Sequence, residues 1–359
     1  MRREKRALGP DPPLTRGAKY ASIPALEVPG FPRLRDAYDV LILGGGHAGL
    51  AAALKTGLLG YTALLVDRGP KYGRSYYAPK MDNIPGFPEG ISGHKLLDLQ
   101  IAALKQVESA VTYVAPGLAT KIVRLPSGEY ELEFEWLKRA HTARGRAAVL
   151  AVGVVDRMPV VDGKIDPIFP WANFGIVDFC ILCDGHTLPG RSVGVLGNDA
   201  YAVRTALDLL HFRPKSVELL TLGRPLLEGS PDAEREELTR RMTEMGISRV
   251  DAPVVGFDQI REKRFGVRFA DGTSRIYDKG FSGLGWYDQH HALPQSLGCR
   301  IDEEGYVVTD EDCRAIADSD GRPIPGLYCV GDLRNGWNQI PEAWATAERA
   351  IIHAYAYYL

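Results

Sequence analysis

The sequence has no apolar run long enough to span a bilayer and no excess of one charge. The 43 Lys and Arg residues nearly balance the 45 Asp and Glu residues, so the formal net charge is −2. This balance gives no electrostatic reason to expect nucleic acid or a membrane surface as a partner. The basic start at 1–6 is followed by prolines and not by the apolar segment of a signal peptide. We therefore expect a cytoplasmic protein with an N-terminal extension, 1–37, of which 1–18 are flexible.

Cysteine is scarce: the chain has five, and only Cys180 and Cys183 lie close together in the sequence. An odd, scattered set is a poor framework for a secreted protein and fits an intracellular redox enzyme. Two cysteines separated by two residues can close a small disulfide ring, and a lowered pKa would make one of them the attacking thiolate. Asp184 follows directly. Three alternatives stay open: half of a zinc site, two buried structural cysteines and, for Asp184, a helix cap or turn.

Glycine, in contrast, is abundant, and one cluster of it has a defined context. A short apolar strand, 39–43, runs into Gly44-Gly45-Gly46-His47-Ala48-Gly49, a helix opens at 50–55, and a second strand, 62–66, leads to Asp67. This order is that of a G-x-G-x-x-G dinucleotide site. The helix N-terminus would hold the phosphates, and Asp67 would accept hydrogen bonds from ribose hydroxyls. The motif alone does not separate FAD from NAD.

The glycines of this loop have separate roles in such a site. Gly44 would permit the tight turn, Gly46 would let the backbone approach the pyrophosphate, and Gly49 would let the helix pack closely on the strand. His47 and Ala48 are the two spacer residues of the motif.

Three further segments resemble those of the low-molecular-weight thioredoxin reductases. Residues 81–93, MDNIPGFPEGISG, resemble the family segment N-x-P-G-F-P-x-G-I-x-G, and 180–185, CILCDG, resembles C-A-x-C-D-G. Residues 326–332, GLYCVGD, resemble the family's second flavin motif and are followed by Gln339 and an Ala-rich helix. The segments occur in the family's order and spacing, so the resemblance covers residues 38–359.

The resemblance implies an α/β fold with two Rossmann-like nucleotide-binding domains. The FAD-binding domain would be discontinuous, formed by 38–155 and 286–359, and 156–285 would be an inserted NADPH-type domain that carries the C-x-x-C motif. Catalysis would rest on Cys180 and Cys183 as the redox pair and on Asp184 as the group that exchanges protons with them. A homodimer is expected by the same analogy. The implied FAD-binding residues, from the glycine loop and the family-matched segments, are Gly44, Gly46, His47, Ala48, Gly49, Asp67, Arg68, Asn83, Gly331, Asp332, Asn338, Gln339 and Ile340.

The second nucleotide motif departs from the family pattern. After the strand 192–196, the chain reads Gly197-Asn198-Asp199-Ala200-Tyr201-Ala202, with Asp199 where the family has the second glycine. A carboxylate there would repel a pyrophosphate, and its Cβ would obstruct close approach. The family's H-R-R-x-x-x-R run is also absent, and only Arg224 remains. NADPH is therefore a doubtful cofactor.

We expect an FAD-dependent disulfide oxidoreductase that exchanges electrons between the flavin and the Cys180–Cys183 pair and passes them to a thioredoxin-like protein. Its donor would be ferredoxin or a second flavin, and no metal is expected. One alternative is an oxidase that takes electrons from a small dithiol and passes them to oxygen. Another is an NADPH-dependent thioredoxin reductase with a divergent motif. A flavin sensor without enzymatic activity is the alternative from a different class.

Overall fold

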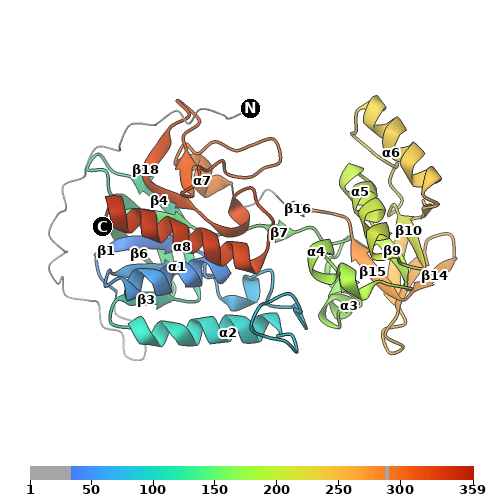
Figure 1. Cartoon of the computed structure of the whole chain (residues 1–359), viewed down its shortest axis with the longest axis horizontal. Coiled ribbons are helices and arrows are strands. Elements are labelled where there is room, and N and C mark those ends of the chain that lie inside the picture. Colours follow the sequence, from blue (N-terminus) through green and yellow to red (C-terminus); the bar gives the residue numbers. More distant parts are fainter. Residues whose placement is uncertain (1–33, 288–290) are drawn as a thin grey trace. The chain divides into compact units, whose positions relative to one another are not determined.

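The computed structural model describes residues 34–287 and 291–359, so the predicted flexible segment 1–18 lies outside the described residues. The chain divides into two compact units, which are drawn in Figure 1. The first contains the described residues of Met1–Gly73, Lys95–Val154 and Asp288–Leu359, and the second contains Arg74–His94 and Val155–Tyr287. The predicted domain limits would assign 74–94 to the first domain, whereas the compact units place this segment with the second.

The first unit is built on an eight-stranded sheet. Its parallel part has the order β18-β6-β1-β2-β3, β17 pairs antiparallel with β18, and β5 pairs antiparallel with both β4 and β6. The short apolar runs of the sequence become fully buried strands here, as expected for a parallel sheet covered on both faces. The strands are β1 (Ala37–Leu43), β2 (Ala63–Val66), β3 (Val111–Val114), β4 (Gly117–Arg124), β5 (Tyr130–Trp136), β6 (Arg139–Leu150), β17 (Arg314–Ile316) and β18 (Pro323–Cys329).

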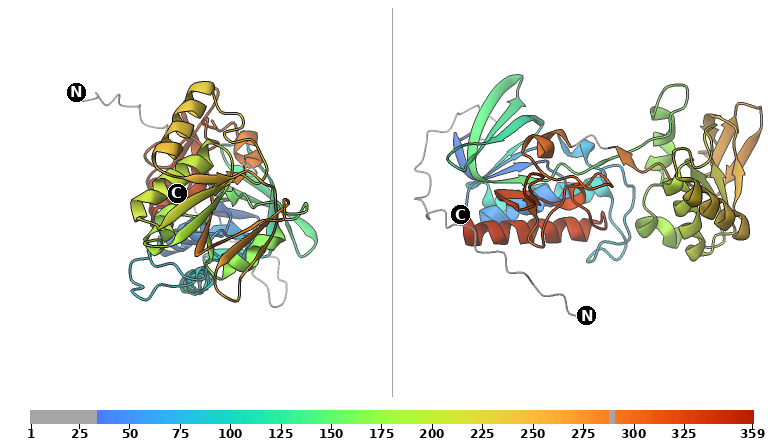
Figure 2. Two further views of the ribbon diagram at one scale, coloured as in Figure 1. Left: turned by 90° about the vertical axis from the view of Figure 1, so that its right-hand side faces the viewer. Right: turned by 90° about the horizontal axis from the view of Figure 1, so that it is seen from above.

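Two long helices of this unit, α1 (His47–Leu58) and α8 (Ile340–Tyr357), lie side by side (Figures 1 and 2). The core combines inward-facing residues of the parallel strands with large side chains of the antiparallel extension, among them Tyr130, Phe134 and Trp136. The remaining helical segments are α2 (Gly93–Ala103) and α7 (Ala292–Ser296), with the short 3-10 turns η1 (Pro70–Tyr72), η2 (Leu104–Val107) and η6 (Gly331–Leu333).

The second unit has its own parallel sheet, with the strand order β11-β10-β9-β15-β8. Alternate residues of β9 enter different clusters, since Val193 and Val195 pack with α5 and α6, whereas Leu196 packs with the three-stranded β12-β13-β14 sheet. Both faces of the central sheet are thus covered. Its strands are β8 (Val177–Asp178), β9 (Ser192–Leu196), β10 (Ser216–Leu220), β11 (Ser248–Val250) and β15 (Lys279–Ser282).

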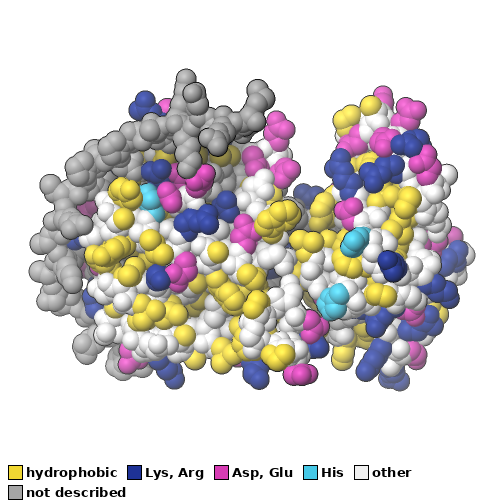
Figure 3. Space-filling view, viewed as in Figure 1, with side chains coloured by type: hydrophobic (Ala, Val, Ile, Leu, Met, Phe, Trp, Pro, Cys, Tyr) yellow, Lys and Arg dark blue, Asp and Glu magenta, His cyan; other side chains and the backbone are white. Residues whose placement is uncertain are grey.

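The other elements of the second unit surround this sheet. The exposed face of α6 carries charges of both signs (Figure 3), with Arg240 bonded to Glu237 and Glu244. These elements are β7 (Val155–Asp156), η3 (Asp166–Ile168), α3 (Phe169–Asn173), α4 (Ile181–Asp184), η4 (Gly185–Thr187), α5 (Ala200–Leu209), η5 (Leu210–Phe212), α6 (Asp232–Glu244), β12 (Val254–Asp258), β13 (Phe265–Phe269), β14 (Ser274–Tyr277) and β16 (Trp286–Tyr287).

Each unit therefore has a parallel sheet with a glycine turn between a strand and a helix, β1 to α1 in the first and β9 to α5 in the second. This confirms the predicted α/β fold with two Rossmann-like domains. Among residues 34–287 and 291–359, no helix combines the length and hydropathy that a membrane span needs.

Candidate functional site

The first glycine loop has the close packing that the motif predicts. Gly44 has a φ of +98°, and a Cβ there would lie 2.5 Å from the carbonyl oxygen of Ala151. A Cβ at Gly49 would overlap the carbonyl oxygen of Gly44, so the first turn of α1 can approach the loop only with glycine. Gly46 is different, because a Cβ there would meet no atom within 4 Å. The space beside Gly46 is where a ligand's phosphate could approach the backbone.

The helix that follows begins earlier than the sequence predicted, at His47 and not at 50. Its N-cap is Gly46, and no side chain caps the helix. A helix N-terminus without a side-chain cap is a typical anion-binding site, because its first backbone N–H groups have no carbonyl acceptor four residues earlier. Ala48 lies in this first turn and is buried.

Asp67 follows β2 and faces the same loop. Its Oδ2 accepts hydrogen bonds from the Gly69 N–H at 3.1 Å and from the Tyr113 hydroxyl at 3.2 Å. A Cβ at Gly45 would lie 2.6 Å from the Asp67 Cγ, so the carboxyl group contacts the glycine turn. The neighbouring Arg68 is exposed, with its guanidinium carbon 4.3 Å from the centre of the Tyr72 ring.

The carboxyl-terminal motif lies at the start of α8, beside the same helix α1. Gly331 has a φ of +64°, a Cβ there would lie 3.0 Å from the Ala48 Cβ, and its N–H donates to the Thr346 hydroxyl at 3.0 Å. Asp332 follows in η6 and acts electrostatically on His47. Gln339 is the N-cap of α8 and Ile340 its first residue. This brings the sequence-predicted residues of both flavin motifs together in the first unit.

Two buried polar atoms of this region have no hydrogen-bond partner among the described residues: Asn338 Oδ1, an acceptor, and Trp344 Nε1, a donor. The ring of Trp344 meets that of His47 edge to face, at 6.4 Å between centroids. His47 hydrogen-bonds to Gln100, and burial lowers its pKa. A buried polar atom without a partner is costly, so this region suits a bound group that both donates and accepts hydrogen bonds. Sequence reasoning missed Trp344, whose only signal is its place in the Ala-rich helix.

Asn83 is the predicted flavin residue that does not belong to the first compact unit. Asn83 belongs to the 74–94 segment of the second unit, whereas the other predicted flavin residues belong to the first.

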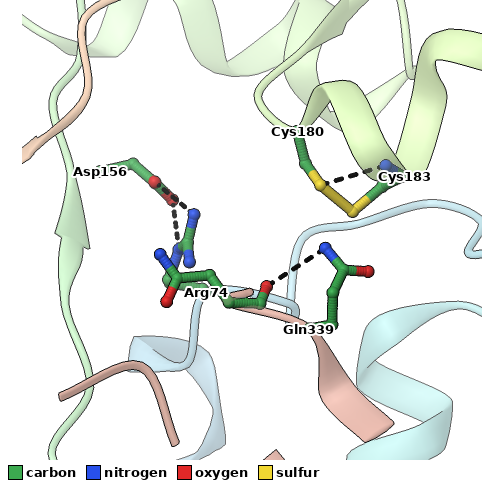
Figure 4. Close-up of a disulfide and its surroundings, with 6 residues drawn as sticks. Arg74, Asp156, Cys180, Cys183 and Gln339 are labelled. Carbon is green, nitrogen blue, oxygen red and sulfur yellow. Dashed lines mark hydrogen bonds and ion pairs between the residues drawn. A yellow bond between two sulfur atoms is a disulfide. The ribbon is translucent and has the colours of Figure 1, made fainter. Parts of the chain in front are cut away.

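The dithiol motif forms a disulfide in the second unit. The Cys180–Cys183 bond has an S–S length of 2.02 Å and a Cα–Cα distance of 5.2 Å. Cys180 is the N-cap of α4, and its Sγ accepts a hydrogen bond from the Cys183 N–H at 3.2 Å (Figure 4). Both cysteines are half-buried, and Leu182 between them is 58% exposed. The residues place a disulfide where a partner can approach it.

Asp184 ends α4 and is the titratable group closest in sequence to this disulfide. Burial and the neighbouring carboxylates of Asp178 and Asp82 raise the pKa of Asp184 to about 7, against the opposing effect of Lys279. Asp184 also stands at the N-cap position of η4, but its side chain makes no capping hydrogen bond there. A carboxyl group with a pKa near neutrality can both give and take a proton at physiological pH.

The second glycine loop is held by the chain's own groups. Asp199 is the N-cap of α5, and its Oδ1 accepts a hydrogen bond from the Ala202 N–H at 3.0 Å. Gly197 has a φ of +144° and packs against Ala202 and Gly283. The sequence predicted repulsion of a phosphate by Asp199. The structure adds that its carboxylate already satisfies an N–H group at the helix N-terminus that a phosphate would use.

The segment after β10 closes over this loop. The Leu227 N–H donates to the Asn198 carbonyl oxygen at 2.6 Å, and the Asn198 side-chain amide donates to the Pro225 carbonyl oxygen at 3.0 Å. Leu227 is buried in the same cluster as β9 and α5, and Arg224 is exposed. Sequence reasoning missed Leu227, because nothing in the local sequence shows which side of the loop packs inward.

A small pocket lies near the carboxyl ends of β8 and β15 in this unit, the edge where ligands of parallel sheets bind. Its wall includes an ion pair in which the Arg74 guanidinium donates to both oxygens of Asp156, at 2.8 and 2.9 Å (Figure 4). The pocket is lined by Arg74, Asp156, Phe179, Tyr201, Ser282 and Gly285.

The other three cysteines, Cys299, Cys313 and Cys329, are buried in the first unit. Burial raises the pKa of the Cys313 thiol to about 11 and that of Cys329 well above its usual value. Such thiols are poor nucleophiles. In the part of the chain that the structure describes, no cluster of His, Cys, Asp and Glu could hold a metal ion.

Comparison with known proteins agrees with the two-domain fold and the disulfide described above. The family model of the pyridine nucleotide-disulphide oxidoreductases matches residues 38–349. The thioredoxin reductase of Listeria innocua is 27% identical over 304 residues, covering 83% of this chain and 86% of that protein. Solved thioredoxin reductases share the fold: that of Streptococcus pyogenes has a TM-score of 0.73 at 22% identity, covering 90% of this chain and 98% of its own. That of Giardia duodenalis has a TM-score of 0.72 at 19% identity, covering 90% and 99%.

Proposed function

Because the chain belongs to the pyridine nucleotide-disulphide oxidoreductase family and is a thioredoxin reductase-like, FAD-dependent disulfide oxidoreductase, we propose that it reduces a disulfide of a thioredoxin-like protein. Electrons would reach the Cys180–Cys183 pair from FAD, and FAD would receive them from reduced ferredoxin or a second flavin and not from NADPH. We further propose that the enzyme acts in the cytoplasm as a homodimer, a state that light scattering of the purified protein tests.

The residues of the first unit suit FAD. The open space beside Gly46 and the uncapped N-terminus of α1 would take the pyrophosphate, and Asp67 would accept from the ribose. The Asn338 Oδ1 and Trp344 Nε1 atoms, which have no partner among the described residues, would bond to polar atoms of the cofactor. Bound FAD supplies two-electron redox chemistry. In this proposal, residues 38–155 and 286–359 form the FAD domain and 156–285 the domain that carries the dithiol.

The dithiol and Asp184 would carry out the exchange with the substrate. A thiolate of the reduced pair attacks the substrate disulfide and forms a mixed disulfide, and the second cysteine then closes the Cys180–Cys183 bond and releases the substrate thiol. The Cys183 N–H that points at the Cys180 Sγ would stabilise negative charge on that sulfur. Asp184, with a pKa of about 7, would exchange the protons that attack and departure require.

The observation that carries the choice of donor is the Asp199 cap. Its carboxylate occupies the N-terminus of α5, so a dinucleotide would have to displace it and would still meet its negative charge. The contacts of Asn198 with Leu227 and Pro225 would also have to open. One exposed arginine, Arg224, is a weak substitute for the several cations that hold a 2′-phosphate.

The deciding experiment is anaerobic reduction of the purified flavoprotein, followed by bleaching of the flavin absorption band. NADPH, NADH, reduced ferredoxin, reduced free flavin and a dithiol are tested in parallel. We expect bleaching within seconds by ferredoxin or free flavin and at least 100-fold more slowly by NADPH, and then thiol formation in added thioredoxin. The Cys180→Ser variant is the control, since its flavin should still bleach while thioredoxin stays oxidised.

Two results would overturn the proposal. Rapid bleaching by NADPH would make the chain a conventional reductase with a divergent motif. Rapid peroxide formation from a small dithiol in air, without transfer to thioredoxin, would make it a dithiol oxidase.

A further inference from the structure

A buried ion pair joins Asp178, two residues before Cys180, to Lys279. Lys279, the first residue of β15, places its Nζ 2.7 Å from the Asp178 Oδ2 at the end of the neighbouring strand β8. The same Nζ donates to the Gly175 carbonyl oxygen at 2.6 Å. The two side chains are only 9% and 7% exposed. Strand β8 leads through Phe179 directly into Cys180.

Stability alone does not explain this pair. Removing two charges from water is costly, and apolar residues of the same size often serve as well or better in such places. The pair lies on two adjacent strands of a parallel sheet whose other buried side chains are mostly apolar, with Ser282 at the end of β15 as a polar exception. Its position next to the redox motif suggests a role in the chemistry there.

The charges of this pair act on Asp184. Asp178 raises the pKa of Asp184 and Lys279 lowers it. Further charged and titratable groups around the cluster come from three other segments: Asp82 with its partner Lys80 from the 74–94 segment, His186 from η4 and Arg191 just before β9. Asp82 lies 3.5 Å from the His186 ring nitrogen, so these two are themselves paired.

The Lys279 ammonium group is bonded to Asp178 and also lowers the pKa of Asp184. An unopposed ammonium group within about 4 to 6 Å lowers the pKa of a carboxyl group by about 1 to 3 units. While Lys279 is paired with Asp178, the negative charge of Asp178 largely cancels the effect of the ammonium group on Asp184. Without Asp178, Lys279 would hold Asp184 as a carboxylate at neutral pH. A permanent carboxylate has no proton to give.

We propose that Asp178 is a positioning residue for the dithiol: by holding the Lys279 ammonium group, it leaves the Asp184 carboxyl group able to bind and release the proton exchanged with the cysteines. This inference rests on the disulfide exchange of the proposed function. In that exchange two protein thiols and one substrate disulfide become one protein disulfide and two substrate thiols. Asp184 takes the proton of an attacking thiol and returns it to a departing thiolate, so protons and electron pairs balance.

The test is the titration of Asp184 in the purified oxidised protein by pH-difference infrared spectroscopy. The carboxylic acid band that disappears in Asp184→Asn identifies the group. In Asp178→Asn we expect the titration midpoint of this band to fall by about 1 to 2 pH units, because a like charge is lost and Lys279 is left unopposed. In the double variant Asp178→Asn/Lys279→Met the midpoint should return to within about half a unit of wild type.

Asp278→Asn is the matched control. Asp278 is adjacent to Lys279 and accepts hydrogen bonds from the Ser192 N–H and hydroxyl. Its loss disturbs the same strand, and Asp278 is not among the groups that shift the pKa of Asp184. The titration midpoint of Asp184 in this variant should equal that in wild type. An unshifted midpoint in Asp178→Asn, or a double variant that titrates as low as the single one, would overturn the proposal.

The double variant also keeps the proposal testable if Asp178→Asn does not fold. It replaces the pair by two uncharged side chains and should remain folded, and a midpoint more than about one unit from wild type would itself contradict the proposal. The proposed function fails in a different way: the wild-type protein would then not reduce thioredoxin at any pH, whatever the infrared midpoints are.

Discussion

At the scale of single residues, the proposed proton exchange depends on how burial and a few charges act on the carboxyl group of Asp184. Asp184 stands directly after Cys183, and burial is the largest of the effects that raise its pKa to about 7. Asp178 adds to the effect and Lys279 opposes it. A surface aspartate at the same place in the sequence would be ionised throughout the physiological range. The environment therefore makes an ordinary residue able to exchange protons at neutral pH.

The raised pKa of Asp184 predicts a pH-dependent effect on stability. The folded protein holds the proton more tightly than the unfolded chain, so this group's favourable contribution is complete below about pH 4 and is lost as the pH rises to about 7. Asp184→Asn cannot ionise. We expect it to be more stable than wild type at pH 8, by on the order of 3 kcal/mol, with a smaller difference at pH 5. Urea unfolding of the oxidised proteins at both pH values measures this.

Asp271, an aspartate whose pKa is lowered and not raised, provides the control. Hydrogen bonds from Thr273 lower the pKa of Asp271, so Asp271→Asn should be less stable than wild type at neutral pH, with the gap closing in acid. A stability difference for Asp184→Asn that does not change with pH would rule out the raised pKa.

At the scale of elements, the two glycine turns have the same strand–turn–helix form, but the N-termini of their helices differ in capping. Helix α1 has no side-chain cap, whereas α5 is capped by Asp199. A helix N-terminus with unpaired N–H groups binds anions, and a carboxylate bonded to those groups removes part of that capacity. One turn is therefore suited to a phosphate group and the other is stabilised without one.

Asp199→Ala tests the stabilising part of this difference. Loss of an N-cap aspartate costs about 1 kcal/mol, and replacement by glycine costs only a few tenths. We therefore expect Asp199→Ala to unfold at lower urea concentration than wild type and Asp199→Gly to lie between the two. Asp232→Ala, at the exposed start of α6, is the control and should change stability less. Equal stability of Asp199→Ala and wild type would contradict the cap.

A pair of glycine variants tests the first turn. A Cβ at Gly49 would overlap a backbone oxygen, whereas a Cβ at Gly46 meets no protein atom within 4 Å. Gly49→Ala should therefore lower the melting temperature of the apoprotein, and Gly46→Ala should leave it unchanged but retain less flavin, measured by the absorbance ratio of flavin to protein. If Gly46→Ala retained flavin as wild type does, the ligand would not approach the backbone there.

Sequence patterns indicated these elements well, and they failed where packing sets the boundary. The strands at 39–43, 62–66 and 192–196 were identified from short apolar runs and correspond to β1, β2 and β9 with shifts of at most two residues at their ends. The start of α1 at His47 was missed, because the spacer residues of the motif already have helical geometry. Trp344 and Leu227 were missed because their importance depends on neighbours distant in the sequence.

At the scale of the whole molecule, the chain has two compact units, each with its own hydrophobic core. The candidate flavin residues other than Asn83 lie in the first unit, and the dithiol and Asp184 lie in the second. The proposed cofactor site and the proposed exchange site would therefore belong to different compact units, and a ligand of one unit should stabilise that unit preferentially.

Calorimetry of the apoprotein tests this division. We expect two unfolding transitions, and added FAD at about 100 times its dissociation constant should stabilise only one of them, by about 2.7 kcal/mol. NADPH should leave both unchanged. A single cooperative transition, or equal stabilisation of both by FAD, would show that the two units do not unfold independently.

The resemblance of three sequence segments to a known family predicted the fold class. The glycine turns, the dithiol pair and the change at Asp199 could be recognised from residue types at fixed short spacings. Tertiary structure alone decided three other features: the pairing of Lys279 with Asp178, the pKa of Asp184 and the closure of the second glycine loop by Leu227. Each of these joins residues from separate strands or loops, and burial and charge separation have no local sequence signature. The proton exchange proposed for Asp184 would therefore follow from packing, although the cysteines could be recognised from their spacing.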